Sequence, residues 1–66
     1  MIVIVNGEEK VVPEGTTLLG LMQMLGVEEK VMAAAVNMQI VKKEAWKERL
    51  LVDGEKVELL QFTGGG

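Results

Sequence analysis

Apolar and polar positions along the first part of the chain predict a β-hairpin. The opening run Ile2–Val5 is β-branched throughout, which favours a strand, and its residues are apolar on both faces, which predicts partial cover on both. Asn6-Gly7 follows at once, and this pair is a strong signal for a two-residue turn. Residues 8–13 then return as a second strand, which must end at Pro13 because proline has no N–H for a sheet hydrogen bond.

A helical pattern occupies the next segment. Its apolar residues recur at the spacing i, i+3, i+4 and i+7, namely Leu18, Leu21, Met22 and Leu25. Thr16 is the expected N-cap, and Gly26 stands where a left-handed C-cap is expected. The sequence therefore predicts one short helix between these two residues.

The middle of the chain predicts short strands and one irregular turn. Residues 31–36 are ambiguous because three alanines favour a helix, but the short length and the turn-prone Asn37 favour a third strand. Ile40-Val41 is expected as a brief fourth strand or the return arm of a turn. Residues 43–49 are too few for a stable helix and should form a single turn with Trp46 facing inward.

The last expected strand is Val57–Phe62, after a turn at Asp53-Gly54. Alternation divides its side chains between two faces, with Val57, Leu59 and Gln61 on one and Glu58, Leu60 and Phe62 on the other. One helix buries the apolar face of a sheet only if it crosses that sheet. The order hairpin, helix, strands and last strand therefore predicts an α+β roll with a mixed sheet.

Length and composition predict one small domain without metal or thiol chemistry. The chain has 66 residues and 48% hydrophobic content, which suits a single domain over residues 1–62 followed by a flexible glycine-rich tail, 63–66. The absence of Cys excludes disulfides and a cysteine zinc site, and the absence of His removes the commonest general base. Together these absences argue against an independent hydrolase or metalloenzyme.

Charge and hydropathy argue against nucleic acid and membrane as partners. The net charge is −3 and the basic residues are scattered, whereas nucleic-acid binding needs a basic stripe. No apolar stretch approaches the ~20 residues that a membrane span requires. The opening apolar run lacks the features of a signal peptide, so a cytoplasmic protein is expected.

The carboxyl end is the best candidate for a reactive group. The last strand leads directly into Thr63 and three glycines, which have no Cβ and can enter a narrow channel. The hypothesis assigns the reactive carboxylate to Gly66 and partner contacts to Gly64, Gly65, Leu60 and Phe62. The alternative is that Leu60 or Phe62 is a core residue under the 38–50 loop.

Several short motifs along the whole chain together carry a family resemblance. They are Asn6-Gly7, Gly15-Thr16, Ala35-Val36-Asn37, Gln39-Ile40-Val41, Trp46, Asp53-Gly54-Glu55 and Gly65-Gly66. Their combination resembles the ThiS family of sulfur carriers, which belongs to the ubiquitin-like β-grasp group. The chain departs from the family pattern at three positions. Lys42 stands where the family often has Pro, and Glu55 stands where it often has Asp. Gly64 makes three terminal glycines where two are required.

The resemblance implies a β-grasp roll, with a mixed four- to five-stranded sheet packed on one main helix, and a carrier function. A ThiF-like adenylyltransferase would use ATP to adenylylate the Gly66 carboxylate. A sulfur donor such as a cysteine desulfurase would convert it to a thiocarboxylate, and a ThiG-like thiazole synthase would receive the sulfur in thiamin biosynthesis. The chain itself would bind no cofactor and would not be an enzyme.

Three other functions remain open from the sequence. One is a MoaD-like sulfur carrier for molybdopterin or another pathway, although such proteins are typically longer in the middle. Another is a ubiquitin-like modifier conjugated through Gly66. The last is a binding module that does not need its terminal glycines.

Overall fold

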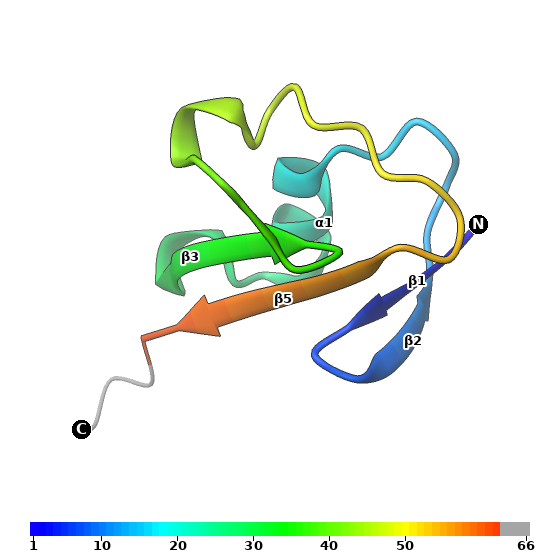
Figure 1. The fold of residues 1–66 in the computed structure, drawn as a ribbon, viewed down its shortest axis with the longest axis horizontal. Helices are drawn as coiled ribbons and strands as arrows, with labels where there is room; N and C mark the ends of the chain where they lie inside the picture. The colour runs from blue at the N-terminus through cyan, green and yellow to red at the C-terminus, as the bar shows by residue number, and fades with distance from the viewer. Residues whose placement is uncertain (63–66) are drawn as a thin grey trace.

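The fold is a five-stranded mixed sheet with one helix packed across one face (Figure 1). The computed structural model describes residues 1–62, so the expected tail at 63–66 lies outside the described residues. The elements are β1 (Ile2–Val5), β2 (Glu8–Val11), α1 (Leu18–Leu25), η1 (Glu28–Lys30), β3 (Val31–Val36), β4 (Gln39–Val41), η2 (Lys43–Ala45) and β5 (Lys56–Gln61). This arrangement confirms the predicted α+β roll.

The strand order β2-β1-β5-β3-β4 places the last strand in the middle of the sheet. β5 runs parallel to β1, where Val5 pairs with Val57, and antiparallel to β3, where Ala34 pairs with Leu59. Figure 1 shows β5 passing between β1 and β3. The two hairpins β1–β2 and β3–β4 are therefore joined into one sheet only through β5.

The hydrophobic core lies between α1 and one face of the sheet. Leu18, Leu21 and Met22 are fully buried, and so are Val3 and Val57 from the sheet below them. This packing confirms the predicted helical stripe. Gly26 ends the helix with φ 70°, in the left-handed conformation that was expected at this position.

The start of the helix corrects one prediction, because the N-cap is Thr17 rather than Thr16. The Thr17 hydroxyl oxygen accepts a hydrogen bond from the Gly20 N–H at 3.0 Å. Thr16 is held outside the helix, since its carbonyl accepts from the Leu51 N–H at 3.0 Å and its hydroxyl donates to the Pro13 carbonyl at 2.6 Å. A long-range contact therefore moves the helix start by one residue.

The middle of the chain agrees with its predictions. Residues 31–36 form β3, the brief fourth strand is β4, and Trp46 follows the single turn η2 with only 3% of its surface exposed. The Trp46 indole Nε1 donates to the Val41 carbonyl at 2.9 Å, which ties η2 to the end of β4. No helix within residues 1–62 is long and apolar enough to cross a membrane.

The first strand has the partial cover on both faces that was expected. On one face of β1, Val3 and Val5 lie in the core. On the opposite face Ile4 is half-buried and Ile2 is 42% exposed, because α1 covers one side of the sheet only. The sheet therefore keeps a second, partly apolar face that faces solvent.

Candidate functional site

The central strand β5 presents the expected partner-binding residues. Val57 and Leu59 lie beneath α1, whereas Leu60 and Phe62 are each 62% exposed. The alternative that Leu60 or Phe62 is a core residue under the 38–50 loop is therefore wrong. β5 ends at Gln61, so the strand leads directly to the candidate residues Gly64, Gly65 and Gly66, which lie outside the described residues and whose roles stay predictions.

A clamp at Asn6 holds the last part of β5 on its β1 side. The backbone pairing between β1 and β5 extends only to Val57, and the Asn6 side chain takes over beyond it. Its Oδ1 accepts from the Leu59 N–H at 2.8 Å, and its Nδ2 donates to the Leu59 carbonyl at 3.2 Å. Asn6 has φ 48°, which asparagine tolerates better than most residues. The Asn-Gly signal predicted the turn but not this second role of its asparagine.

The other side of β5 is held by β3 and by η1. Leu60 pairs with Ala33, and the Phe62 N–H donates to the Lys30 carbonyl at 2.7 Å. Backbone contacts therefore fix the strand to the last residue that the structure describes.

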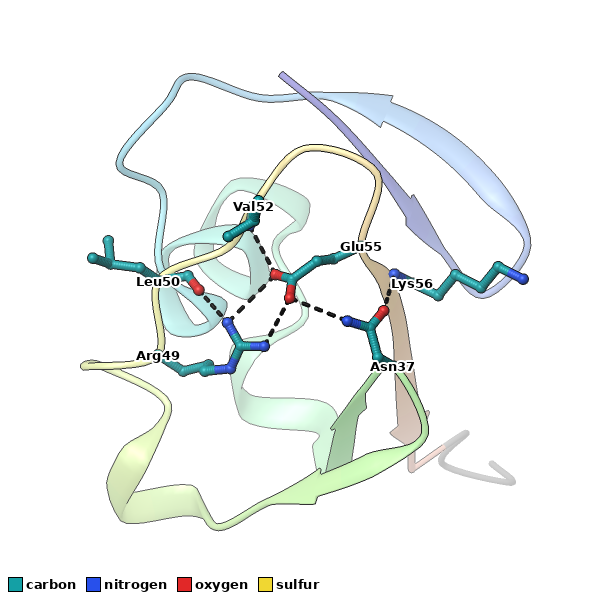
Figure 2. A network of polar contacts seen from close by, with 6 residues as sticks. All are labelled: Asn37, Arg49, Leu50, Val52, Glu55 and Lys56. Atoms are coloured by element: carbon teal, nitrogen blue, oxygen red, sulfur yellow. Dashed lines mark hydrogen bonds and ion pairs between the residues drawn. The ribbon is translucent and has the colours of Figure 1, made fainter.

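A polar network fixes the beginning of β5 (Figure 2). Arg49 donates from Nη2 to Glu55 Oε2 at 2.8 Å and from Nη1 to Oε1 at 3.4 Å, and the Val52 N–H donates to Oε1 at 2.8 Å. Asn37 Nδ2 donates to Glu55 Oε2 at 3.2 Å. The Asn37 Oδ1 in turn accepts from the Lys56 N–H at 3.0 Å. The network thus joins the β3–β4 turn, the 49–55 loop and β5.

The carboxylate of Glu55 is stabilised in its charged form by this network. The hydrogen bonds from the Arg49 guanidinium are the main cause that holds the pKa of Glu55 below its ordinary value of 4.5. Burial acts in the opposite direction, while the Val52 N–H, the charge of Arg49 and the Asn37 amide add to the lowering of the pKa. Glu55 is therefore a structural acid rather than a proton donor at neutral pH.

The face of the sheet opposite α1, here called the open face, carries a hollow that is mostly apolar. The register pairs Ala35 with both Glu58 and Ile40, and Ala33 with Leu60, so these five residues share the open face. The hollow measures about 360 Å³ and is lined by Asn6, Ala33, Ala34, Ala35, Ile40, Glu58, Leu59 and Leu60. Ile40 is 73% exposed beside it. The exposed apolar surface at Leu60 therefore extends across three strands.

A second hollow adjoins the first along β5. It also measures about 360 Å³ and is lined by Ile4, Gly7, Met38, Lys56, Val57 and Glu58. Met38 stands at the tip of the β3–β4 turn with φ 70° and is 84% exposed. The sequence placed Glu58 on the same face of the last strand as Leu60 but did not connect Met38 and Ile40 with that face. The alternation within residues 39–41 and the small residues at 33 and 35 are the signals that point to this surface.

Comparison with known proteins gives two relatives in sequence. The sulfur carrier protein ThiS of Escherichia coli is 30% identical over 66 residues, and the match covers the whole of both chains. A thiazole synthase of Paramagnetospirillum magneticum is 35% identical over the same 66 residues. This chain spans 20% of the length of that relative.

Solved structures and a family model agree with these relatives. The crystal structure of the thiamine biosynthesis protein ThiS from Geobacter metallireducens superposes with a TM-score of 0.82, at 33% identity over the whole of both chains. The solution structure of a thiamine biosynthesis protein from the same organism gives 0.81 at 30% identity, over all of this chain and 88% of the other. The fold is thus the expected β-grasp. Since the model of the ThiS family also matches residues 2–66, the chain belongs to the ThiS family.

Proposed function

We propose that this protein is a sulfur carrier of thiamin biosynthesis that is loaded at the C-terminal carboxylate of Gly66. One observation carries the proposal: the strand that leads to the terminal glycines is the central strand of the sheet and is held on both sides. A strand fixed in this way presents its carboxyl end in a constant direction. Because the chain belongs to the ThiS family, we interpret this geometry as the means by which the C-terminal carboxylate is presented for loading with sulfur.

The chemistry requires an activating partner. A carboxylate is a poor acyl donor at neutral pH because it has no good leaving group. A ThiF-like adenylyltransferase supplies one by transferring AMP from ATP, which releases pyrophosphate, and it provides the electrostatic stabilisation of the transition state. Persulfide sulfur from a donor such as a cysteine desulfurase then attacks the acyl adenylate and displaces AMP, which leaves an acyl disulfide between Gly66 and the donor cysteine. A second thiol cleaves this S–S bond, forms a disulfide with the donor cysteine, and leaves a thiocarboxylate at Gly66. The carrier is thus a co-substrate that binds no cofactor, and we place the reaction in the cytoplasm with its ATP supply.

The relative named thiazole synthase supports a ThiG-like enzyme as the recipient of the sulfur. A segment similar to this whole chain accounts for one fifth of that protein. A carrier-like segment and the sequence of a sulfur-consuming enzyme thus belong to one polypeptide there. We infer that this chain meets a thiazole synthase after it has been loaded.

Docking of the tail requires contacts beyond the glycines. We propose that residues 63–66 form a flexible tail, and ordering four such residues would cost about 4–8 kcal/mol at about 1–2 kcal/mol per residue. Full burial of a large apolar side chain contributes about 1.5–3 kcal/mol, so Leu60 and Phe62, each 62% exposed, supply about 2–4 kcal/mol together. This amount does not offset the ordering cost. The adenylylating partner should therefore also cover the hollows of the open face.

The test is the intact mass of the full chain after incubation with a cognate adenylyltransferase, ATP and a sulfur source. Exchange of one carboxylate oxygen for sulfur adds about 16 Da. A variant without Gly65 and Gly66 is the control and should gain nothing. A wild-type chain of unchanged mass would refute the carrier function. Binding to the large subunit of molybdopterin synthase instead of thiazole synthase would favour the MoaD-like alternative, and adducts on lysines would favour a modifier.

A further inference from the structure

We propose that Glu58 makes the open face selective for a partner that presents an arginine or lysine side chain, and that this partner is the adenylylating enzyme. That the partner is the adenylylating enzyme rests on the proposed function. That the partner side chain is basic is argued from the residues of the sheet. Glu58 is the charged residue among those that line the first hollow, which is mostly apolar, and it also lines the second hollow beside it.

The surroundings of Glu58 are unlike those of an ordinary surface glutamate. Its partner across to β3 is Ala35, and Leu60 follows two residues later on the same face. Within residues 1–62 its carboxylate takes part in no ion pair or hydrogen bond, whereas Glu55 on the same segment is held by three side chains or backbone groups. Glu58 is therefore an available acceptor set in an apolar surface.

A partner that covers the open face buries the Glu58 carboxylate, and this burial determines which chemical groups the partner surface must carry. Burial of a carboxylate without a counter-charge costs several kcal/mol, which would cancel the gain from Leu60 and Ile40 beside it. A cation opposite Glu58 removes that penalty and adds charge-assisted hydrogen bonds. The partner surface should therefore be apolar around one basic group.

The hollow beside Glu58 has the form that such a side chain needs. Ala33 and Ala35 leave about 360 Å³ next to the carboxylate, lined otherwise by aliphatic carbon of Ile40 and Leu60. The methylene stem of an arginine packs on such a surface while its guanidinium reaches the carboxylate at the edge. Arginine also matches both carboxylate oxygens at once, which lysine does not.

Other charged residues on this face do not neutralise Glu58. Lys56 lies two residues earlier on β5, lines only the second hollow, and forms no ion pair within residues 1–62. Glu9 shares the face beyond Ile4 and adds a second negative charge. A second copy of this chain is a poor occupant, because each copy carries a net charge of −3 and a two-fold axis through this hollow would bring two Glu58 carboxylates together.

The experiment measures the equilibrium dissociation constant of the full-length chain for the purified adenylylating enzyme, without ATP, by titration calorimetry. The variants are Glu58→Lys and Glu58→Gln, and Glu14→Lys in the β2–α1 loop is the matched control for the charge change. Reversal at Glu58 should raise the constant by about tenfold to a hundredfold, and neutralisation by about threefold to tenfold. Glu14→Lys should stay within about twofold of the wild type. Urea unfolding followed by Trp46 fluorescence checks that all variants fold alike.

The outcomes separate this inference from the carrier function. If Glu58→Lys binds within about twofold of the wild type, or the wild type does not bind, selection by Glu58 is wrong. If Glu58→Lys weakens binding but the wild type never gains the mass of sulfur, selection by Glu58 stands and the carrier function fails. Dimerisation of the wild type through the open face, measured by sedimentation, would assign the face to a second copy and overturn the proposal.

Discussion

The clamp between Asn6 and Leu59 should account for a large share of the stability of the domain. We predict that Asn6→Gly lowers the free energy of unfolding by about 1–2 kcal/mol. The two hydrogen bonds, at 2.8 and 3.2 Å, would be worth about 0.5–1.5 kcal/mol each, and the exposure of Asn6 places them in the lower part of that range. Domains of this size have a total stability of about 3–10 kcal/mol, so the expected loss is a substantial fraction.

Substitution by glycine separates the effect of losing the side-chain hydrogen bonds from the effect of backbone strain. Asn6 has φ 48°, which glycine adopts freely, so Asn6→Gly removes the two hydrogen bonds without adding strain in the folded state. Asn6→Ala removes the same bonds and adds about 1 kcal/mol for the left-handed conformation. Asn6→Asp keeps the acceptor for the Leu59 N–H but loses the donor to its carbonyl, so its stability should fall between those of the wild type and Asn6→Gly.

Urea unfolding is the assay, with the fluorescence of the buried Trp46 as the probe. At a slope of about 1 kcal/mol per M, the midpoint of Asn6→Gly should fall by about 1–2 M. Hydrogen exchange should also become faster at the Leu59 amide, which the clamp protects in the wild type. A midpoint of Asn6→Gly that equals that of the wild type would refute the structural reasoning about the clamp.

Two further substitutions test the turn of the second hairpin and the network behind it. Met38→Gly should stabilise the domain by about 1 kcal/mol, because Met38 has φ 70° and its exposed side chain contributes little to the core; an unchanged or lower urea midpoint would contradict this. Glu55→Gln should destabilise the domain by about 1–2 kcal/mol at pH 7 through the loss of the charged contacts with Arg49. Because the pKa of Glu55 is lowered on folding, its contribution is complete above pH 4.5 and is lost as the pH falls below that value. The urea midpoints of the wild type and Glu55→Gln should therefore converge in acid, and a constant difference would show that the carboxylate charge is not the cause.

The local elements of the fold were predictable because their signals lie close together in the sequence. The pattern of Leu18, Leu21 and Met22 indicated the helix and its buried face, and Gly26 indicated its end. The third strand at 31–36 was predicted against the helix propensity of its alanines. Contacts between distant residues were not predictable in this way. The N-cap was placed one residue early because the hydrogen bond from the Leu51 N–H to the Thr16 carbonyl leaves no local signal in the sequence.

The candidate site was predictable only along β5. Alternation correctly placed Leu60 on the face opposite Leu59, and the structure shows that it is exposed. The neighbours of Leu60 across the sheet, Ala33 and Ile40, depend on the register between strands, which the sequence does not specify by itself. The clamp at Asn6 joins residues 53 positions apart, so the local turn signal at Asn6-Gly7 gave no indication of it.

The position of β5 has a consequence for synthesis on the ribosome. Among the five strands it is the last to be translated, yet it occupies the centre of the sheet. A nascent chain without residues 56–61 has two separate hairpins with unpaired inner edges, which are prone to aggregation. Early termination thus removes the middle of the sheet together with the chain end. Prematurely released products should therefore be cleared by proteases and should not compete with the full-length chain for the proposed activating enzyme.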